Sequence, residues 1–443
     1  MLIAHRDETI CALSSGALPC GVAVIRISGP KSRFVIETIC RKLPEPRKAS
    51  VRRLCDPANG EALDQAVVLW LPGPHTVTGE DMAELQVHGS RAVVAAVLRV
   101  VLRLHGVRMA EAGEFTRRAY DNGRMDLTEV EGFADLLAAE TEAQRRQALR
   151  QAEGGLGRRL SDWRARLIRA RAWIEAELDF TEEADIPDGV AERTWAEIAA
   201  LAAEMQAELT ASRVSERIRR GVVVAVLGPP NAGKSSLVNA LAQRDVAIVS
   251  PEAGTTRDAL EVDLDLGGVP VRLIDTAGLR EAAGLIEAEG IRRALARAET
   301  ADLVLWLRPA NGDGGPLPTL EASTPVWEIV SRADEAAPAI DSDSFRISVR
   351  SGEGLEALIE RLAGFAGGAA GNAEIGLMTR ERHFQSVARA IGWMRDAVRG
   401  ADIPIELRGE LLRRAGDEIG RITGAIGTDD LLDVIFREFC VGK

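Results

Sequence analysis

The sequence predicts an α/β and α protein: an N-terminal α/β domain, a helical domain, and an α/β domain with a doubly wound sheet inserted into the helical one. Short apolar runs alternate with Gly- and Pro-containing turns over residues 1–118. Segments rich in Ala, Glu, Arg and Leu occupy residues 119–215 and 367–443. Between them, residues 216–366 alternate apolar strands with helices, so we expect this region to interrupt one helical domain.

The N-terminal region carries strand and helix patterns. Residues 23–27 and 66–70 are apolar and largely β-branched, which predicts strands. Residues 92–104 predict a helix, because Arg99 and Arg103 fall four positions apart on one face. The same arginines break the longest apolar run, so no segment reaches the ~18 residues that span a bilayer. The first ten residues lack a secretory signal, and we expect a cytoplasmic protein without a membrane contact.

Long helices are predicted in the region that follows. Thr128 with Glu131 fits a capping box at a helix start. Residues 160–178 and 191–209 carry helical patterns, and residues 185–189 (Asp-Ile-Pro-Asp-Gly) interrupt them as a turn.

The inserted region begins with a run of apolar, mostly β-branched residues, 222–227, typical of a strand buried on both faces of a parallel sheet. Residues 271–274 and 303–307 repeat the pattern. Residues 364–376 are rich in Gly and Ala, which predicts a linker back to the helical domain.

Composition excludes several classes of function. The net charge of -12 argues against broad, non-specific binding of nucleic acid, although a local basic patch or an RNA bound through a partner stays open. Five cysteines without a C-x-x-C pair argue against a disulfide framework and a zinc site. We expect four of them to be small buried hydrophobes: Cys11, Cys20, Cys40 and Cys55.

A phosphate-binding loop is predicted at residues 228–235, which read Gly-Pro-Pro-Asn-Ala-Gly-Lys-Ser. A buried strand precedes it and an apolar helix, 236–241, follows, as the motif requires. Backbone N–H groups would cradle the phosphates, Lys234 would reach the outer ones, and the Ser235 hydroxyl would hold Mg²⁺. The nucleotide-binding residues predicted here are Asn231, Ala232, Gly233, Lys234, Ser235 and Ser236.

Two further segments complete the expected phosphate site. Asp275 ends a predicted strand, where an acid can support Mg²⁺, and Gly278 lets the backbone approach a γ-phosphate. Residues 254–258 hold two threonines, one of which can bind Mg²⁺ only with the γ-phosphate present, so the loop would act as an order–disorder switch. The residues predicted to contact the nucleotide here are Ser250, Thr255, Thr256, Asp275, Thr276, Ala277 and Gly278, with Thr256 on Mg²⁺.

The base site departs from the usual guanine motif Asn-Lys-x-Asp, because residues 331–334 read Ser-Arg-Ala-Asp. Asp334 can accept from guanine N1 and N2, and Arg332 can stack on the base, while Ser331 is shorter than Asn. Ser348 begins a loop similar to the further Ser-Ala-Lys motif. We expect GTP, bound more weakly than usual, with adenine as the alternative.

The chain resembles the MnmE (TrmE) family of tRNA-modification GTPases, in the TrmE-Era-EngA-like GTPase class. The resemblance rests on the nucleotide motifs, including residues 275–281, which many GTPases share. It also rests on blocks that are much more selective for the family: residues 21–29, 78–89, 113–127 and the final Cys-x-Gly-Lys, 440–443. It implies a homodimer formed through an N-terminal domain that binds 5-formyl-tetrahydrofolate. It also implies a partner, MnmG, which uses FAD and NADH, in a heterotetramer.

The resemblance further implies the reaction. The two proteins would add an aminomethyl or carboxymethylaminomethyl group to C5 of the wobble uridine of certain tRNAs, driven by a potassium-dependent GTPase whose G domains pair. Folate contacts carried over from the family are Arg26, Glu84, Arg124 (often lysine) and the terminal Lys443, each of which could instead be an ordinary surface charge. Potassium ligands carried over are Asn231, Ser250, Glu252 through its carbonyl, and Thr255.

Hydrolysis needs a residue that orients water. Leu279 stands where many GTPases have a glutamine, and leucine cannot do this. The family resemblance assigns the role to Glu287, which would act through a bridging water, with Lys234 as the other catalytic residue; a solvated helical glutamate is the alternative. Cys440 has two readings: a nucleophile toward C6 of uracil, or packing at the end of a helix over 431–439.

Two other functions share parts of this pattern. A ribosome-assembly GTPase without modification activity has the same nucleotide motifs, but the RNA-binding module expected after its G domain is not visible in this sequence. A membrane-remodelling GTPase is disfavoured because the sequence lacks a basic amphipathic anchor.

Overall fold

The computed structural model describes residues 8–179, 190–244, 246, 261–275, 301–311, 324–335, 345–370, 376–400, 402–426, 435, 439, 441 and 442. Two compact units make up the chain. Unit 1 comprises Met1–Ala134, Ala152–Arg164 and Ile419–Lys443, and unit 2 comprises Asp135–Gln151 and Ala165–Glu418. The observed mixture of sheets and helices confirms the predicted fold class.

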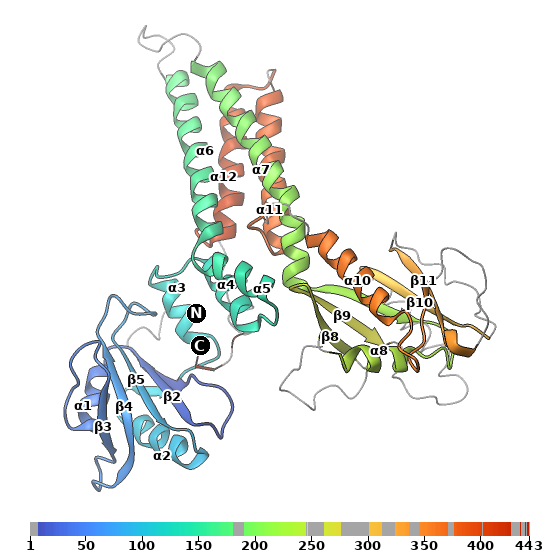
Figure 1. Ribbon diagram of the computed structural model, residues 1–443. Helices are drawn as coiled ribbons and strands as arrows, with labels where there is room; N and C mark the ends of the chain where they lie inside the picture. The colour runs from blue at the N-terminus through green and yellow to red at the C-terminus, as the bar shows by residue number, and fades with distance from the viewer. Residues whose placement is uncertain are drawn as a thin grey trace, which may run out of the picture. The chain divides into compact units, whose positions relative to one another are not determined.

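Unit 1 is built on a sheet with strand order β3-β4-β5-β2-β1-β6 (Figure 1). All neighbouring strands are antiparallel except β1 and β6. The strands are β1 (Thr9–Leu13), β2 (Val22–Ser28), β3 (Ser50–Cys55), β4 (Ala62–Leu71), β5 (Met82–His88) and β6 (Val107–Met109). Helices α1 (Ser32–Cys40) and α2 (Arg91–Leu102) share one apolar core with the sheet, which fixes the face that they cover. The strands predicted over 23–27 and 66–70 are confirmed, and the helix predicted over 92–104 ends two residues early.

Two shorter helices follow: α3 (Glu114–Asp121) lies in unit 1, and α4 (Leu127–Ala138) begins in unit 1 and belongs to unit 2 from Asp135 on. The capping box predicted at Thr128 and Glu131 is wrong by two positions. Asp126 caps α4, since its Oδ1 accepts from the backbone N–H groups of Thr128 at 2.7 Å and Glu129 at 2.9 Å. In return, the Glu129 carboxylate accepts from the Asp126 N–H at 2.7 Å, and the two residues form the box.

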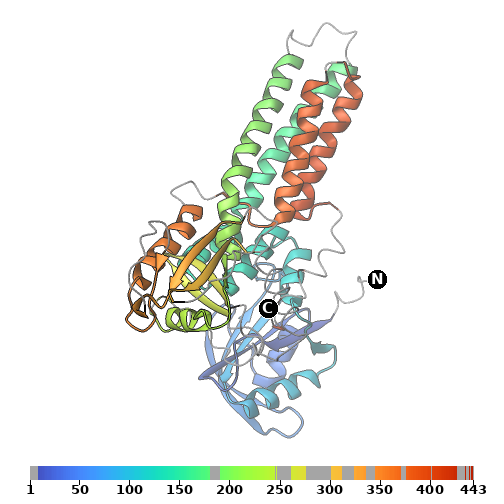
Figure 2. The ribbon, with the colours of Figure 1, turned by 90° about the vertical axis from the view of Figure 1, so that its right-hand side faces the viewer.

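A helical bundle follows the short α5 (Glu142–Ala152). The bundle consists of α6 (Gly155–Asp179), α7 (Val190–Arg220), α11 (Glu381–Arg399) and α12 (Ile405–Thr423). These helices run side by side in both views (Figures 1 and 2). The helices predicted over 160–178 and 191–209 lie within α6 and α7. The turn predicted over 185–189 lies outside the described residues.

The inserted part of unit 2 is a sheet with strand order β12-β11-β10-β7-β9-β8. Only β8 is antiparallel to its neighbour. Its strands are β7 (Val222–Leu227), β8 (Glu261–Leu266), β9 (Val269–Asp275), β10 (Leu303–Pro309), β11 (Val326–Ser331) and β12 (Phe345–Arg346), with helix α8 (Lys234–Ala242) and the single turn η1 (Ala333–Glu335). The three strands predicted in this region, within β7, β9 and β10, are confirmed.

The linker predicted over 364–376 is wrong in its first half, because α10 (Leu355–Ala370) continues through it. Ala366 is fully buried in the core of the inserted sheet, together with Leu358 and Leu362. Burial of this apolar face holds the helix together despite its glycines, which lower helix propensity by about 1 kcal/mol each.

The buried cysteines are fewer than expected. Cys11, Cys40 and Cys55 are buried as predicted, whereas Cys20 is exposed. Burial raises the pKa of the Cys11 thiol to about 12, which keeps it protonated at neutral pH. Among the described helices, none is both long and apolar enough to cross a membrane.

Candidate functional site

The phosphate loop connects the end of β7 to the start of α8. Gly228 has φ +151°, and a Cβ built on it would lie 2.3 Å from the Leu307 carbonyl oxygen on β10. Gly233 precedes α8 with φ +89°, a left-handed conformation that favours glycine. Both glycines are therefore required by backbone geometry, one by close approach and one by its dihedral angles. The strand–loop–helix context that the sequence predicted for this motif is present.

Lys234 lies within the loop itself. Its Nζ donates to the carbonyl oxygens of Gly228 and Pro229, both at 2.9 Å, and the residue is only 9% exposed. The loop backbone therefore holds a cation at the N-terminus of α8. A positive charge at the N-terminal end of a helix is suited to a phosphate chain.

Asp275 ends β9 on the strand next to β7. Its Cα is paired with that of Val226, the residue before the last one of β7. The carboxyl ends of these two parallel strands meet at one edge of the sheet, so Asp275 and the phosphate loop share that edge. This is the edge at which the sequence predicted an acid supporting Mg²⁺.

Asp334 and Ser348, predicted in the base site, are in direct contact. The Ser348 hydroxyl, fully buried, donates to Asp334 Oδ1 at 2.6 Å. The Arg350 guanidinium lies 3.9 Å from Asp334 Oδ2. The hydrogen bond from the Ser348 hydroxyl is the main cause that lowers the pKa of Asp334 below its usual range, and the positive charges of Arg350 and Arg332 lower it further. Asp334 is thus fixed as an ionised acceptor.

Ser331 and Arg332, where the motif departs from the usual pattern, contact the phosphate loop. The Ser331 hydroxyl donates to the Ala232 carbonyl at 2.7 Å, and the Arg332 guanidinium donates to the Asn231 carbonyl at 2.8 Å. The two loops are 99 residues apart along the chain at Ser331 and Ala232. These two hydrogen bonds could not be predicted from the sequence, because local patterns carry no information about contacts between distant segments.

Ten predicted site residues lie outside the described residues, so their placement stays a prediction: Ser250, Glu252, Thr255, Thr256, Thr276, Ala277, Gly278, Glu287, Cys440 and Lys443.

The predicted folate residues Arg26 and Glu84 form a pair on neighbouring strands of unit 1. Their Cα atoms are in register on β2 and β5, and Arg26 Nε donates to Glu84 Oε1 at 3.1 Å. The Arg26 guanidinium also lies 5.9 Å from the centroid of the Phe115 ring. Both side chains of the pair are about one fifth exposed, so they remain accessible to a ligand. The third residue, Arg124, lies beside Gly79, whose added Cβ would be 3.2 Å from Arg124 Cγ.

The described end of the chain is docked on the first strand of unit 1. Val441 forms an antiparallel bridge with Ala112, and the Ser14 hydroxyl donates to the Gly442 carbonyl at 2.7 Å. A Cβ on Gly442 would lie 2.0 Å from the Leu13 carbonyl oxygen, and its φ is +96°. On β1, Leu13 follows Ala12, whose Cα partner is Arg26. The tail therefore lies against β1, the strand next to β2, which carries Arg26.

A buried network of charges in unit 1 was missed by sequence reasoning. Arg118, with 9% of its side chain exposed, bonds to Glu80 at 3.0 Å and to Glu114 at 3.1 Å. Arg108 bonds to the same Glu114 with both Nη atoms, at 2.8 and 2.6 Å. Glu80, Glu114 and Arg118 stand in the blocks 78–89 and 113–127, and Arg108 lies just before the second block. Their spacing in the chain was visible, but their pairing across the fold was not.

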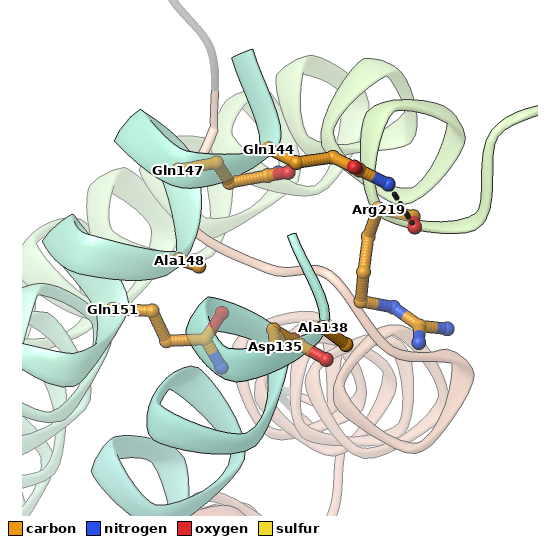
Figure 3. A pocket seen from close by; sticks show the side chains of 7 residues that line it. All are labelled: Asp135, Ala138, Gln144, Gln147, Ala148, Gln151 and Arg219. Atoms are coloured by element: carbon orange, nitrogen blue, oxygen red, sulfur yellow. Dashed lines mark hydrogen bonds between the residues drawn. The ribbon is translucent and has the colours of Figure 1, made fainter. Parts of the chain in front are cut away.

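A polar pocket in unit 2, of about 120 Å³, lies between α4, α5 and α7 (Figure 3). It is lined by Asp135, Ala138, Gln144, Gln147, Ala148, Gln151 and Arg219. Its glutamines bind the backbone at the end of α7, since Gln144 donates to the Arg219 carbonyl at 3.1 Å and Gln147 to the Ser215 carbonyl at 2.9 Å. The pocket wall thus anchors the helix that leads directly into β7. No sequence pattern had indicated this pocket.

Comparisons with known proteins match the whole chain. The model of the MnmE helical domain matches residues 127–440, and the model of the GTP-binding protein TrmE N-terminus matches residues 9–124. A tRNA modification GTPase MnmE from Brucella suis is 51% identical over 442 residues, covering 100% of this chain and 99% of the relative. The protein of the same name from Brucella canis is 50% identical with the same coverage. Among solved structures, the G domain of the T. maritima FeoB iron transporter is 28% identical over 33% of this chain and 98% of that chain, with a TM-score of 0.25.

Proposed function

The chain belongs to the MnmE family and is a GTPase of tRNA modification, and we propose that, with MnmG, it adds an aminomethyl or carboxymethylaminomethyl group to C5 of the wobble uridine of certain tRNAs. The main support is that the chain is about 50% identical, over its full length, to tRNA modification GTPases named MnmE. The phosphate loop adds to this support, because its lysine and glycines have the geometry that the motif requires. tRNA and MnmG are the proposed partners, in a heterotetramer, and the cytoplasm is the proposed location.

The nucleotide site is proposed to use a divalent and a monovalent cation. Ser235 and Thr256 would hold Mg²⁺, with Asp275 beside them, and the ion would neutralise phosphate charge when bound. Asn231 would hold K⁺ together with Ser250, Glu252 and Thr255. The Asn231 backbone is left-handed at φ 62°, and its carbonyl accepts a hydrogen bond from Arg332, so the position of the residue is fixed. Its side chain carries an amide oxygen, which is the kind of atom that binds a hard cation such as K⁺.

This chain's own residues would hold and turn over GTP in three roles. Lys234 binds the outer phosphates, and Asp334 accepts from the base. Glu287 orients the attacking water, because Leu279 cannot. We expect E287A to cut single-turnover hydrolysis at least about a hundredfold while leaving GTP affinity unchanged. E289A, two residues away, is the control. Unchanged hydrolysis in E287A would remove this assignment.

The N-terminal region is proposed as the folate site and the dimer contact. The Arg26–Glu84 pair offers a cation and an acceptor, Arg124 a second cation, and the docked tail would bring Lys443 and Cys440 to the same strands. A reduced folate carries carboxylates, which suit the two arginines, and ring N–H groups, which suit Glu84.

We propose the following domain boundaries: a folate-binding and dimerisation domain over 1–118, a helical domain over 119–215 and 367–443, and a G domain over 216–366.

The role in modification is tested by analysing the wobble uridine of tRNA from a strain that lacks this gene. We expect the modified base to disappear, to return with the wild-type gene, and to stay absent with K234A. K48A, a change at an exposed loop lysine, should restore it fully. Normal modification in the deleted strain would contradict the proposal. If immature ribosomal subunits accumulated there instead, the alternative of a ribosome-assembly GTPase would be favoured.

A further inference from the structure

The base loop, residues 331–335, is bound to the phosphate loop by two adjacent hydrogen bonds. Ser331 Oγ donates to Ala232 O at 2.7 Å, and Arg332 Nη2 donates to Asn231 O at 2.8 Å. Asn231 and Arg332 both have positive φ, 62° and 55°, which is uncommon for residues other than glycine. Each loop is therefore held in an unusual backbone conformation at the point where the two meet.

The single proton of the Ser331 hydroxyl is committed to this contact. A serine side chain has one O–H donor. Ser331 is 4% exposed, and the other oxygen near its Oγ is the Arg308 carbonyl at 3.3 Å, which also accepts. Guanine presents N7 and O6 as acceptors along one edge. An acceptor on the base would have to take this proton away from the phosphate loop.

Arg332 is also directed to protein partners. Besides the bond to Asn231, its Nη1 lies 3.7 Å from Glu335 Oε2. The same Glu335 oxygen accepts from Asn311 Nδ2 at 2.7 Å, which fixes the carboxylate. The guanidinium is thus held between the phosphate loop and its own loop.

Asp334 offers an acceptor that suits the other edge of guanine. An ionised carboxylate only accepts, so its partners on guanine are the N1–H and N2 amino donors. Ser348 fixes one carboxylate oxygen at 2.6 Å, and Arg350 lies near the other.

We propose that this chain recognises guanine through the N1 and N2 donors at Asp334 and does not read N7, because Ser331 serves as a tether between the base loop and the phosphate loop. The proposal rests on the proposed function, which supplies a guanine nucleotide, and adds the edge of the base that is selected. Ser331 is in this account a positioning residue.

The test compares three diphosphates by calorimetric titration of the full-length protein with Mg²⁺. 7-Deaza-GDP lacks only the N7 acceptor, and IDP lacks only the N2 amino group. We expect 7-deaza-GDP to bind within about twofold of GDP, and IDP at least about tenfold more weakly. A loss of tenfold or more with 7-deaza-GDP would overturn the proposal while leaving the GTPase function intact. Failure of all three to bind would defeat the proposed function together with the inference.

Two variants separate tethering from reading. S331A removes the tether, and we expect it to weaken all three nucleotides by the same factor, about three- to tenfold. S331N supplies two amide donors, so one can reach Ala232 while the other reaches N7. We expect S331N to prefer GDP over 7-deaza-GDP by at least about fivefold. S351A, at an exposed hydroxyl in the neighbouring loop, should change nothing. If S331A weakened GDP but not 7-deaza-GDP, Ser331 would be a base reader after all.

Discussion

Asp334 illustrates how one side chain depends on its neighbours for its charge state. The buried Ser348 hydroxyl donates to it, and Arg350 and Arg332 add positive charge, so the pKa of Asp334 lies below its usual range. A depressed pKa keeps the carboxylate ionised as pH falls, and the acceptor is lost only when pH drops through that lowered value. Base binding should therefore be insensitive to this group between pH 8 and about pH 5.

The S348A substitution tests the hydrogen bond between Ser348 and Asp334. Removal of the hydroxyl should weaken GDP binding about fivefold at pH 7, since a hydrogen bond to a charged group contributes about 1 kcal/mol or more. It should also raise the pKa of Asp334, so the deficit of S348A relative to wild type should grow as pH falls from 7 toward 4.5. Titration calorimetry at both pH values measures this, with S351A as the control. A deficit that is constant with pH would show that Ser348 does not govern the ionisation of Asp334.

The sequence motifs could predict which residues belong to the base site, but not which atoms these residues contact. Asp334 and Ser348 were identified because fixed spacings after predicted strands assign them roles. The role of Ser331 could not be identified, since a hydroxyl that stands in place of an amide gives no indication that it bonds to a loop 99 residues away. The residues outside the described ranges stay predictions.

At the scale of elements, the cap of α4 shows why boundaries are hard to predict. The pattern of a capping residue followed three positions later by Glu occurs twice, at Asp126 and Glu129 and at Thr128 and Glu131. Sequence alone does not choose between them. In the fold, the Thr128 hydroxyl donates to Asp126 Oδ1 at 2.6 Å, so Thr128 supports the cap instead of forming one. The strands with continuous apolar runs, β2, β4, β7, β9 and β10, were easier to predict, because such runs indicate burial directly; the other strands of the two sheets were not predicted.

The charge network that joins β6, α3 and the loop before β5 makes a prediction about stability. Burial raises the pKa of Glu114, but the hydrogen bonds from Arg108 and the Glu111 N–H outweigh burial, and the net shift is downward. Because the folded-state pKa is depressed, the stabilisation is fully present above the ordinary glutamate pKa of about 4.3. It is lost as pH falls through the lower folded-state value.

Urea unfolding of E114Q measures this contribution. We expect the free energy of unfolding at pH 7 to fall by about 2–3 kcal/mol, the range for hydrogen bonds to buried charged groups. The difference from wild type should shrink as pH is lowered toward 3. E37Q removes an exposed i, i+4 pair with Arg33 and should cost less than about 0.5 kcal/mol. An equal loss in the two variants would mean that the network adds nothing beyond a surface pair.

Across the whole molecule, residues from the two ends of the chain meet in unit 1. Ser14 and Gly442 are 428 positions apart and share a hydrogen bond, and Val441 bridges Ala112. The resemblance of the final Cys-x-Gly-Lys to the family motif indicated that the tail matters. It could not indicate that Gly442 is required by close contact with Leu13, because that requirement exists only in the folded chain.

We predict that G442A undocks the tail. The added methyl group would clash with the Leu13 carbonyl oxygen at a backbone conformation that disfavours alanine. Affinity for 5-formyl-tetrahydrofolate should fall at least about tenfold, while intrinsic GTP turnover stays at the wild-type level. V441A keeps the backbone bridge and removes only a half-exposed side chain, so it serves as the control. Wild-type folate affinity in G442A would separate the tail from the folate site.

The loop around Lys234 is proposed to bind the triphosphate of GTP. Titration of the full-length protein with a non-hydrolysable GTP analogue in the presence of Mg²⁺ and K⁺, beside K234A under the same conditions, tests this binding. We predict saturable binding to the wild type and an affinity at least about tenfold lower in K234A, which lacks the ammonium group. No binding by the wild type, or equal binding by the two proteins, would contradict it.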